Sequence, residues 1–411
     1  MRTLIGAPAL WVALEYVRGN LFFLAFPLNL LGHSQHNYLP MIQIADTTGV
    51  YGISFILVMV NQFLSHVPDF FRIRKEAPDK RLVIQLLSVL VVVTFTFSYG
   101  WYRLNIPDSS RRMRVALVQA NLVVPENIMP FPQQRSHMTR YMELTRDAAR
   151  YRPNLVLWPA SSLPGSLAAF YIKSPILQLS REINAYILVG GSGQAKDMPK
   201  KDAIPRYANS EFLISPEGMI DGQYNKMLLT PFNDYVPLKG IVRWPDWITS
   251  AKQNFTPGTE FTIFHVTGTH FGTLICWENF FPDQFRRFVA KGAQFMVTVT
   301  NEAFLGNNSA AGSYQTLAMN VFRAVENRVT VARAAATGVS CFISSRGEIV
   351  DRVKDGNGKD LSVSGILVRD IPLSDKKTFY TVYGDVFAYV VIGITIVMIL
   401  ISAMRLEKKP S

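Results

Sequence analysis

The stretch LVIQLLSVLVVVTFTFSYGWY, from Leu82 to Tyr102, contains 21 residues without a charged side chain. At a rise of about 1.5 Å per residue, a helix of this length can cross a hydrocarbon core about 30 Å thick. After a short polar connection, the run VALVQA from Val115 to Ala120 has the composition of a buried β-strand. The chain therefore passes from a membrane-spanning helix into a domain of a different kind.

Other apolar segments lie on both sides of that domain. Thr48 to His66 and Val386 to Met404 are uncharged and long enough to span a membrane. The segment from Leu4 to Leu31 is interrupted by Glu15 and Arg18, which lie one helical turn apart and can pair on one face. We expect this segment to form a helix packed against the others, because charges inside a membrane domain face protein rather than lipid.

Composition agrees with a protein that is partly embedded in lipid. Only 18% of the 411 residues are charged and 49% are hydrophobic, and the net charge is +12. A basic balance fits nucleic acid, an anionic bilayer surface or the flanks of membrane helices. Five cations occupy one loop between predicted spans, which favours the last interpretation, and no nucleic-acid-binding pattern is present. These cations are Arg72, Arg74, Lys75, Lys80 and Arg81.

The same loop orients the chain. Short cytoplasmic loops are rich in lysine and arginine, so residues 72–81 are predicted to be cytoplasmic. Three divisions follow: residues 1–103 with about three spans, an extracytoplasmic domain over residues 104–378, and residues 379–411 with the last span and a basic cytoplasmic tail. The large domain is therefore predicted to lie outside the cytoplasm.

The extracytoplasmic segment alternates short apolar runs with helix-like stretches. This alternation predicts an α/β fold whose strands are buried on both faces. Predicted strands are Val115 to Ala120, Asn154 to Trp158, Ala185 to Gly190, Glu211 to Ser215, Gly272 to Cys276, Gln294 to Thr300 and Val329 to Ala334. Predicted helices are Gln134 to Arg150, a helix near Pro282 to Lys291, and Ser313 to Asn327.

Cys276 is the leading candidate for a nucleophile. It ends the apolar run GTLIC and precedes Pro282 and a predicted helix, so it lies at a strand-to-helix turn where a thiol can be accessible and activated. An isolated cysteine in a strand is more often a small buried hydrophobe, and this is the only interpretation that Cys341 supports. A disulfide between the two is possible in an oxidising compartment, but it would disable Cys276. No metal-ligand spacing is present, and no cofactor is predicted.

Lys226 lies in YNKMLLTPFNDYVPL between apolar residues. A solvated loop charge is the usual interpretation. If its ammonium group lies beside Cys276, it would lower the thiol pKa and stabilise an oxyanion. The segment NLVLWPASSLPG ends a strand at Trp158, where a catalytic carboxylate could emerge, but it has Ala160 at that place.

Three segments in this order resemble the catalytic segments of the nitrilase superfamily: NLVLWPASSLPG, YNKMLLTPFNDYVPL, and ICWENFFPDQFR with TNEAFLG after it. With ALWVALEYVRG, FPLNLLGHSQ and TGVYGISF in the apolar part, nearly the whole chain resembles the apolipoprotein N-acyltransferase family. The resemblance implies an αββα sandwich inserted between transmembrane helices. It also implies transfer of a fatty acyl chain from a phospholipid, through a cysteine thioester, to the N-terminal amine of a diacylglyceryl lipoprotein.

By the same resemblance, Cys276 is the nucleophile and Lys226 stabilises the oxyanion. Asp234 and Glu278 take supporting acidic positions, the former as Asp where the family usually has Glu. Trp277 occupies a position that is usually Tyr. The bilayer, the phospholipid donor and the lipoprotein acceptor are the implied partners. The implied location is a bacterial inner membrane, with the large domain on the periplasmic side.

The chain departs from the family at two places. Ala160 stands where the resemblance expects the general-base Glu, and loss of such a base costs about 10²–10⁴ in rate. This implies an impaired enzyme. The intact segments around Cys276 and Lys226 favour a Glu-to-Ala change in a competent enzyme over a naturally inactive relative. The chain also begins close to Ala9, where the resemblance expects several more helices before it, as a truncation, a misassigned start or a short natural form would explain.

Two other functions fit the same segments. A membrane-anchored pseudoenzyme would bind lipid or lipoprotein without turnover. A membrane-tethered amidase of the nitrilase type would hydrolyse small carbon-nitrogen bonds with the same cysteine. The apolar segments favour the acyltransferase.

Overall fold

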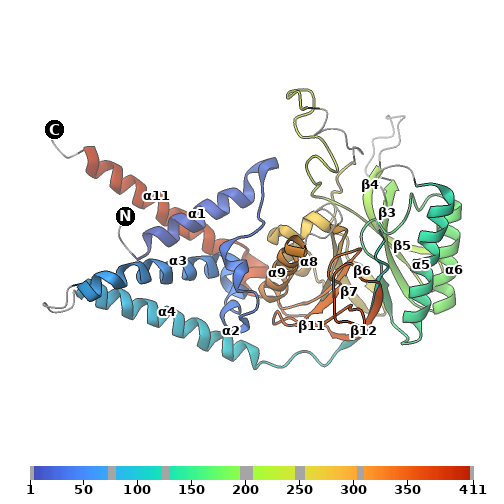
Figure 1. Ribbon diagram of the computed structural model, residues 1–411, viewed down its shortest axis with the longest axis horizontal. Coiled ribbons are helices and arrows are strands. Elements are labelled where there is room, and N and C mark those ends of the chain that lie inside the picture. The colour runs from blue at the N-terminus through green and yellow to red at the C-terminus, as the bar shows by residue number, and fades with distance from the viewer. Residues whose placement is uncertain are drawn as a thin grey trace.

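A computed structural model describes residues 4–72, 80–122, 129–194, 207–245, 255–302 and 310–407. Arg74 and Lys75, which contribute to the predicted orientation, lie outside the described residues. Figure 1 shows a group of long helices at one end and a β-rich body at the other, with β1 following directly after α4.

Two mixed six-stranded sheets form the β-rich body. The first has the order β12-β1-β2-β3-β4-β5 and the second β11-β10-β9-β8-β7-β6. The first contains β1 (Arg112–Gln119), β2 (Leu155–Leu157), β3 (Tyr186–Gln194), β4 (Tyr207–Ile214), β5 (Ile220–Asn225) and β12 (Gly365–Pro372). The second contains β6 (Phe264–Val266), β7 (Thr269–Ile275), β8 (Phe295–Thr300), β9 (Thr330–Ala335), β10 (Cys341–Ile343) and β11 (Ile349–Arg352).

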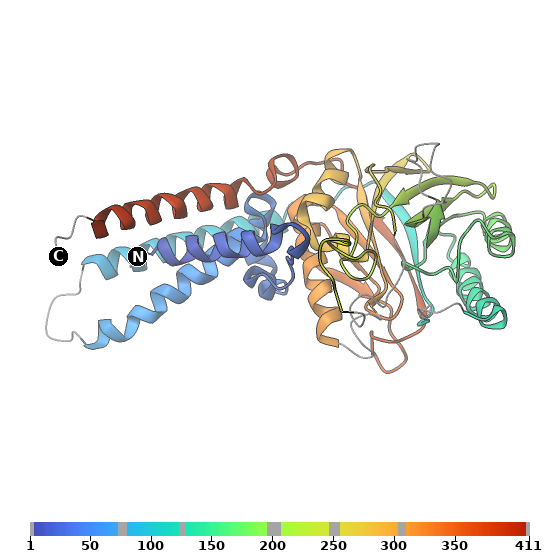
Figure 2. The ribbon, with the colours of Figure 1, turned by 90° about the horizontal axis from the view of Figure 1, so that it is seen from above.

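Helices cover the outer face of each sheet. α5 (Phe131–Ala149) and α6 (Phe170–Ile183) lie against the first sheet, and α8 (Pro282–Ala290) and α9 (Ala310–Asn327) lie on the side of the long helices (Figures 1 and 2). Alternate strand residues therefore enter two different cores. Leu157 and Leu188 pack between the sheets, whereas Val156 and Val189 pack beneath α5 and α6. This is the predicted αββα sandwich, and every strand and helix predicted from the sequence is present with small shifts at its ends.

Three described helices are long and apolar enough to cross a membrane, over Ala45–Val67, Leu82–Leu104 and Val386–Arg405. They belong to α3 (Ala45–Arg72), α4 (Lys80–Leu104) and α11 (Val386–Glu407). The three uncharged runs predicted to span are thus confirmed as helices of sufficient length. Side chains such as Leu87, Val91 and Ile396 are exposed along them, as expected for surfaces that contact lipid.

The first apolar segment forms the expected helix packed against others, but its two charges do not pair with each other. α1 (Gly6–Asn20) has 15 residues, or roughly 22 Å of helix, and it packs against α3 and α11. Within the described parts of residues 1–103, α3 and α4 are the helices of spanning length. Glu15 and Arg18 do not pair. Glu15 Oε1 accepts a hydrogen bond from Leu31 N at 2.6 Å, and Arg18 donates to the carbonyl of Leu28 at 3.0 Å. Both charges instead satisfy backbone groups of the segment that folds back along α1, because that turn leaves peptide groups without partners.

Candidate active site

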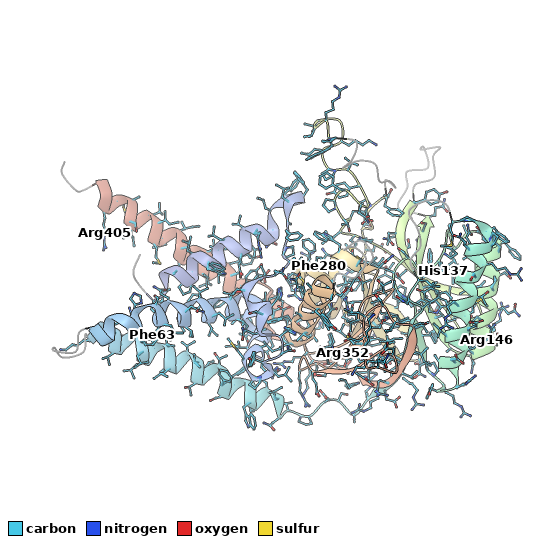
Figure 3. The ribbon with its side chains drawn as sticks, in the orientation of Figure 1. Phe63, His137, Arg146, Phe280, Arg352 and Arg405 are labelled. Atoms are coloured by element: carbon cyan, nitrogen blue, oxygen red, sulfur yellow. The ribbon has the colours of Figure 1, made fainter. Side chains whose placement is uncertain are left out.

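Cys276 follows the last residue of β7 and opens a 3₁₀ turn, Cys276–Phe280, that leads into α8. Its φ of +52° lies in the left-handed region, which costs a non-glycine residue of order 1–3 kcal/mol. Such strain is typical of positions where a side chain is presented at a defined angle. In Figure 3, Phe280 in this turn lies between the long helices and the far layer, which His137 and Arg146 mark on α5. The predicted strand-to-helix turn is therefore present.

The surroundings of the thiol have opposing electrostatic effects. Burial raises the pKa of Cys276, and the positive charge of Lys226 opposes that rise, as do hydrogen bonds from the Thr300 side chain and the Asn301 backbone. The sequence argument expected a helix terminus and a lysine to favour the thiolate. Lys226 acts in the expected direction, but desolvation is the larger effect. The thiol therefore needs a proton acceptor to react at neutral pH.

Lys226 comes directly after β5 and is 1% exposed. Its Nζ donates to Asp234 Oδ2 at 2.6 Å and to Thr230 Oγ1 at 2.8 Å. Asp234 is equally buried, and its Oδ2 also accepts from Thr230 N at 2.7 Å. A buried ammonium group with a fixed carboxylate partner is held in one direction, so Lys226 is not the solvated loop residue that is usual for lysine.

Glu278 holds together the two segments that carry Cys276 and Lys226. Its Oε1 accepts from Tyr224 Oη at 2.8 Å and from Met227 N at 2.6 Å, and its Oε2 accepts from Ile275 N at 2.9 Å. Burial raises the pKa of Glu278, while these donors and the charge of Lys226 oppose the rise. The carboxylate thus joins Ile275, which precedes Cys276, to Met227, which follows Lys226, and this is a supporting role.

Trp277 connects this turn to the membrane-side segment. Its ring centroid lies 5.1 Å from that of Phe280 and 6.0 Å from that of Phe26. Phe26 is 45% exposed and follows α1 in the chain. The residue after the nucleophile therefore contacts the N-terminal apolar region directly.

Ala160 lies just beyond the end of β2 and is 2% exposed. The preceding strand end is fixed by Trp158 N, which donates to Leu188 O at 2.9 Å. Ala160 packs in the core between the two sheets, as do Leu157 and Leu188. Its methyl group points into the layer that also holds Cys276, but it cannot accept a proton.

The structure brings five of the six candidates together around the layer between the sheets: Cys276, Lys226, Ala160, Asp234 and Glu278. The sixth, Trp277, follows Cys276 but packs against Phe26 on the membrane side. Sequence reasoning missed Tyr224, Thr230 and Thr300 as partners of these groups. Thr230 lies inside a quoted segment and Thr300 ends a predicted strand, so their places were available, but a hydroxyl's partner depends on three-dimensional contacts. Cys341 is buried and burial raises its pKa to about 12, and both cysteines are free.

No group of three or more His, Cys, Asp or Glu residues that could hold a metal ion is found within the described part of the chain. The chemistry available at this place is that of a thiol, an ammonium group and buried carboxylates.

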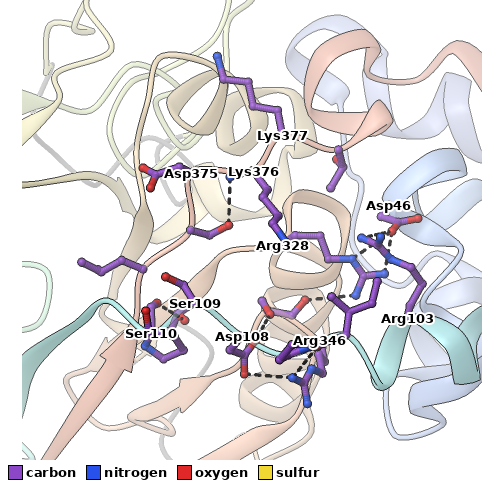
Figure 4. Close-up of a pocket in the computed structure, with 18 of the residues that line it drawn as sticks. Asp46, Arg103, Asp108, Ser109, Ser110, Arg328, Arg346, Asp375, Lys376 and Lys377 are labelled. Carbon is purple, nitrogen blue, oxygen red and sulfur yellow. Dashed lines mark hydrogen bonds and ion pairs between the residues drawn. The ribbon is translucent and has the colours of Figure 1, made fainter.

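A separate cavity of about 850 Å³ lies where the long helices meet the sandwich (Figure 4). Asp46 lies between two of its arginines, at 3.0 Å from Arg103 and 2.8 Å from Arg328, and Arg346 pairs with Asp108 at 3.3 Å. None of the six candidate residues lines this cavity. Its charged groups fix the junction between helices and sandwich, so we assign it a structural role.

Both the sandwich and the N-terminal helices match known protein families. Residues 114–378 match the carbon-nitrogen hydrolase family, and residues 1–63 match the N-terminal domain of apolipoprotein N-acyltransferase. A protein from Geobacter metallireducens named apolipoprotein N-acyltransferase is 37% identical over 94% of this chain and 71% of its own length. One of the same name from Chlorobaculum tepidum is 29% identical over 98% and 77%.

Solved structures with a similar arrangement have lower identity. An amidase of the nitrilase superfamily from Nesterenkonia is 19% identical, with a TM-score of 0.47, over 65% of this chain and 92% of that chain. Nit3 from Saccharomyces cerevisiae, of the same superfamily, is 19% identical, with a TM-score of 0.47, over 64% and 93%.

Proposed function

We propose, from the premise that this chain belongs to the apolipoprotein N-acyltransferase family with its nitrilase-type catalytic domain, that Cys276 carries an acyl group from a phospholipid to a lipoprotein. The chain is an acyltransferase of bacterial membranes. We assign each step of the reaction to a residue. The observation that supports it best is the strained turn at Cys276 beside the buried Lys226–Asp234 pair.

The first half of the reaction forms a thioester. The Cys276 sulfur attacks the ester carbonyl of a phospholipid, the ester C–O bond breaks, and a lysophospholipid leaves with a proton on its oxygen. The ammonium of Lys226 stabilises the tetrahedral oxyanion, and Asp234 holds that ammonium in place. In the second half, the N-terminal amine of a diacylglyceryl lipoprotein attacks the thioester carbonyl, and an amide and the free thiol result.

An apolar rim around this turn favours lipid substrates. Phe22 is 85% exposed and Leu24 is 60% exposed in the segment that reaches Trp277 through Phe26, and Ile241 is 83% exposed in the segment after Asp234. Large apolar side chains that remain exposed at one place mark an interaction surface. We assign this rim to the acyl chains of donor and acceptor, which reach the thiol from the bilayer.

The side of the membrane follows from charge and aromatic residues. Trp101 and Tyr102 end one span and are 67% and 64% exposed, as expected of an interfacial aromatic belt beside the sandwich. With the basic loop at the other end of the same helix, we place the sandwich on the periplasmic face of the inner membrane.

In the simplest version of this mechanism a glutamate at position 160 takes the thiol proton, but this chain has Ala160 there. A methyl group cannot take the thiol proton, and the residues of the proposed mechanism supply no other base. The amidase alternative is disfavoured, because a relative named apolipoprotein N-acyltransferase matches 94% of this chain. The pseudoenzyme alternative requires that Cys276 is never acylated.

The test is acyl transfer in lipid nanodiscs that contain phosphatidylethanolamine and a synthetic diacylglyceryl lipopeptide. The wild-type chain and Ala160→Glu are compared with Cys276→Ala. The proposal expects a triacylated lipopeptide from at least one of the first two and none from Cys276→Ala. No product from either of the first two, with folded protein in the nanodiscs, would contradict it.

A further inference from the structure

A buried carboxyl group close to Ala160 has no partner. Glu211, in β4, is fully buried, and neither carboxylate oxygen has a hydrogen-bond partner among the described residues. Burial alone raises its pKa well above the usual value. Leaving such a group unsatisfied costs stability. Packing gives no reason for a glutamate at this place, since a leucine would fill it without that cost.

The strand register determines which way Glu211 faces. It lies opposite Gly190 on β3 and opposite Tyr224 on β5. Leu213, two residues along β4, packs in the core between the sheets, whereas Phe212 packs under the outer helices. Side chains two residues apart on a strand share a face, so Glu211 points into the inter-sheet layer. This is the layer that contains Ala160 and the chain segments around Cys276.

The space between Glu211 and Ala160 is open because residue 190 is glycine. A methyl group at Gly190 would lie 2.4 Å from Glu211 Oε1 and 3.0 Å from the Cα atom of Ala160. The first distance is shorter than real contacts of a Cβ atom and the second is a tight contact, so the carboxylate occupies the place of the missing side chain, close to Ala160. A carboxylate therefore lies beside the position where the resemblance expects the general base, although it comes from a different strand.

Glu211 also borders the groups around the thiol. Tyr224, its neighbour on β5, donates its hydroxyl to Glu278 Oε1 at 2.8 Å, and Lys226 follows two residues later, directly after the strand. Opposed residues on adjacent strands have Cβ atoms about 4.5–5.5 Å apart. The unpartnered carboxyl thus lies next to the network that positions Cys276.

We propose that Glu211 is the general base and acid of the acyl transfer, in place of a carboxylate at position 160. As the Cys276 sulfur bonds to the ester carbonyl, its proton moves to Glu211, which returns it to the departing glycerol oxygen when the C–O bond breaks. In the second half, Glu211 takes a proton from the attacking amine and returns one to the sulfur as the thioester bond breaks. This inference rests on the proposed function, and it explains both the methyl group at Ala160 and the unpartnered carboxyl.

The test uses the full chain in nanodiscs and follows acylation of Cys276 by phospholipid. Four proteins are compared: wild type, Glu211→Gln, the double variant Ala160→Glu/Glu211→Ala, and Glu217→Gln as a matched control at an exposed position on the loop after β4. A second readout is the rate at which iodoacetamide alkylates Cys276 as a function of pH, and thermal unfolding verifies the fold.

The proposal expects Glu211→Gln to lower the acylation rate about 10²–10⁴-fold, the loss typical of a general base, and to change the pH profile of alkylation. Glu217→Gln should match the wild type. The double variant should regain acylation, because it returns the carboxylate to position 160. A wild-type rate in Glu211→Gln would overturn the inference. An inactive wild type with an active double variant would overturn it too and leave the proposed function intact, whereas no acylation in any variant would overturn both.

Discussion

Two buried glutamates near the layer between the sheets, Glu211 on β4 and Glu278 in the turn after β7, differ in their hydrogen bonds. Glu278 accepts hydrogen bonds from Tyr224, Met227 and Ile275, and so joins the segment of the nucleophile to that of the lysine. Glu211 is as deeply buried and has no partner among the described residues. Burial raises the pKa of both, but only at Glu278 do donors oppose that rise.

The difference separates a structural carboxylate from one held ready for a reaction. A carboxylate that accepts several backbone hydrogen bonds is stabilised as an anion and is a poor proton acceptor. A desolvated carboxyl without donors binds a proton tightly, which is the property that a group exchanging a proton with a thiol requires. Removing the first should therefore affect folding, and removing the second should affect chemistry.

The largest expected effect concerns the cysteines rather than the glutamates. Cys276→Ala should abolish acyl transfer, because no other described nucleophile occupies the turn. Cys341→Ala should retain it, because that thiol is fully buried in the second sheet. Transfer of labelled acyl chains to a lipopeptide measures both. If Cys276→Ala still transferred acyl chains, Cys276 would not be the nucleophile, and Glu211 would have no thiol with which to exchange a proton.

The next effect tests the other fully satisfied carboxylate of the site. Asp234→Asn removes the negative charge 2.6 Å from the buried Lys226 ammonium, and breaking such a pair costs about 3–5 kcal/mol. Glu182→Gln breaks an exposed pair with Arg146 and should cost about 0–1 kcal/mol. Denaturant unfolding measures both. Equal losses would mean that Lys226 does not depend on Asp234.

Glu278→Gln should destabilise the chain by about 1–3 kcal/mol. An amide cannot accept from all the donors that surround the carboxylate, so at least one buried N–H or O–H group remains without a partner. The melting temperatures of Glu278→Gln and Glu211→Gln test the difference between the two glutamates. We expect the first to lower the melting temperature and the second to maintain or raise it at neutral pH. The reverse order would mean that the two roles are exchanged.

The smallest effect is a pH dependence of stability. Because the folded-state pKa of Glu211 lies above its ordinary value of 4.5, the folded chain binds the proton more tightly. The contribution of Glu211 to stability is therefore largest below pH 4.5, falls as pH rises toward the raised pKa, and is constant above it. Glu211→Gln does not titrate, so its melting temperature relative to wild type should rise between pH 4.5 and pH 8. A difference that is constant with pH would contradict an unpartnered, titrating carboxyl.

Periodicity and apolar length predicted most of the fold. The runs at Val115, Asn154 and Gln294 alternate with helices because each strand is buried on both faces, and burial is recorded in composition. In the first apolar segment the packed helix was predicted, but the pairing of Glu15 with Arg18 was not confirmed, because both side chains bind backbone groups of the segment that folds back along α1. The local sequence cannot distinguish such contacts with a distant backbone segment from an ion pair between two side chains one helical turn apart.

The candidate site was predicted as far as its residues lie in continuous segments. Cys276 and Lys226 each follow a recognisable strand end, and Asp234 lies in the same continuous segment as Lys226. Glu211 carries no such signal, since it is one charged residue within an apolar strand, and its proximity to Ala160 depends on the register with Gly190. Residues that act across neighbouring strands become visible only when the strands are paired.

The central claim is that Cys276 carries the acyl group. The most direct measurement is the mass of the peptide that contains Cys276 after the wild-type chain has been incubated in nanodiscs with phosphatidylethanolamine of a single acyl chain. We predict that this peptide gains the mass of that acyl group, that hydroxylamine removes it, and that the peptide containing Cys341 remains unchanged. An unmodified Cys276 in folded, lipid-embedded protein would contradict the claim.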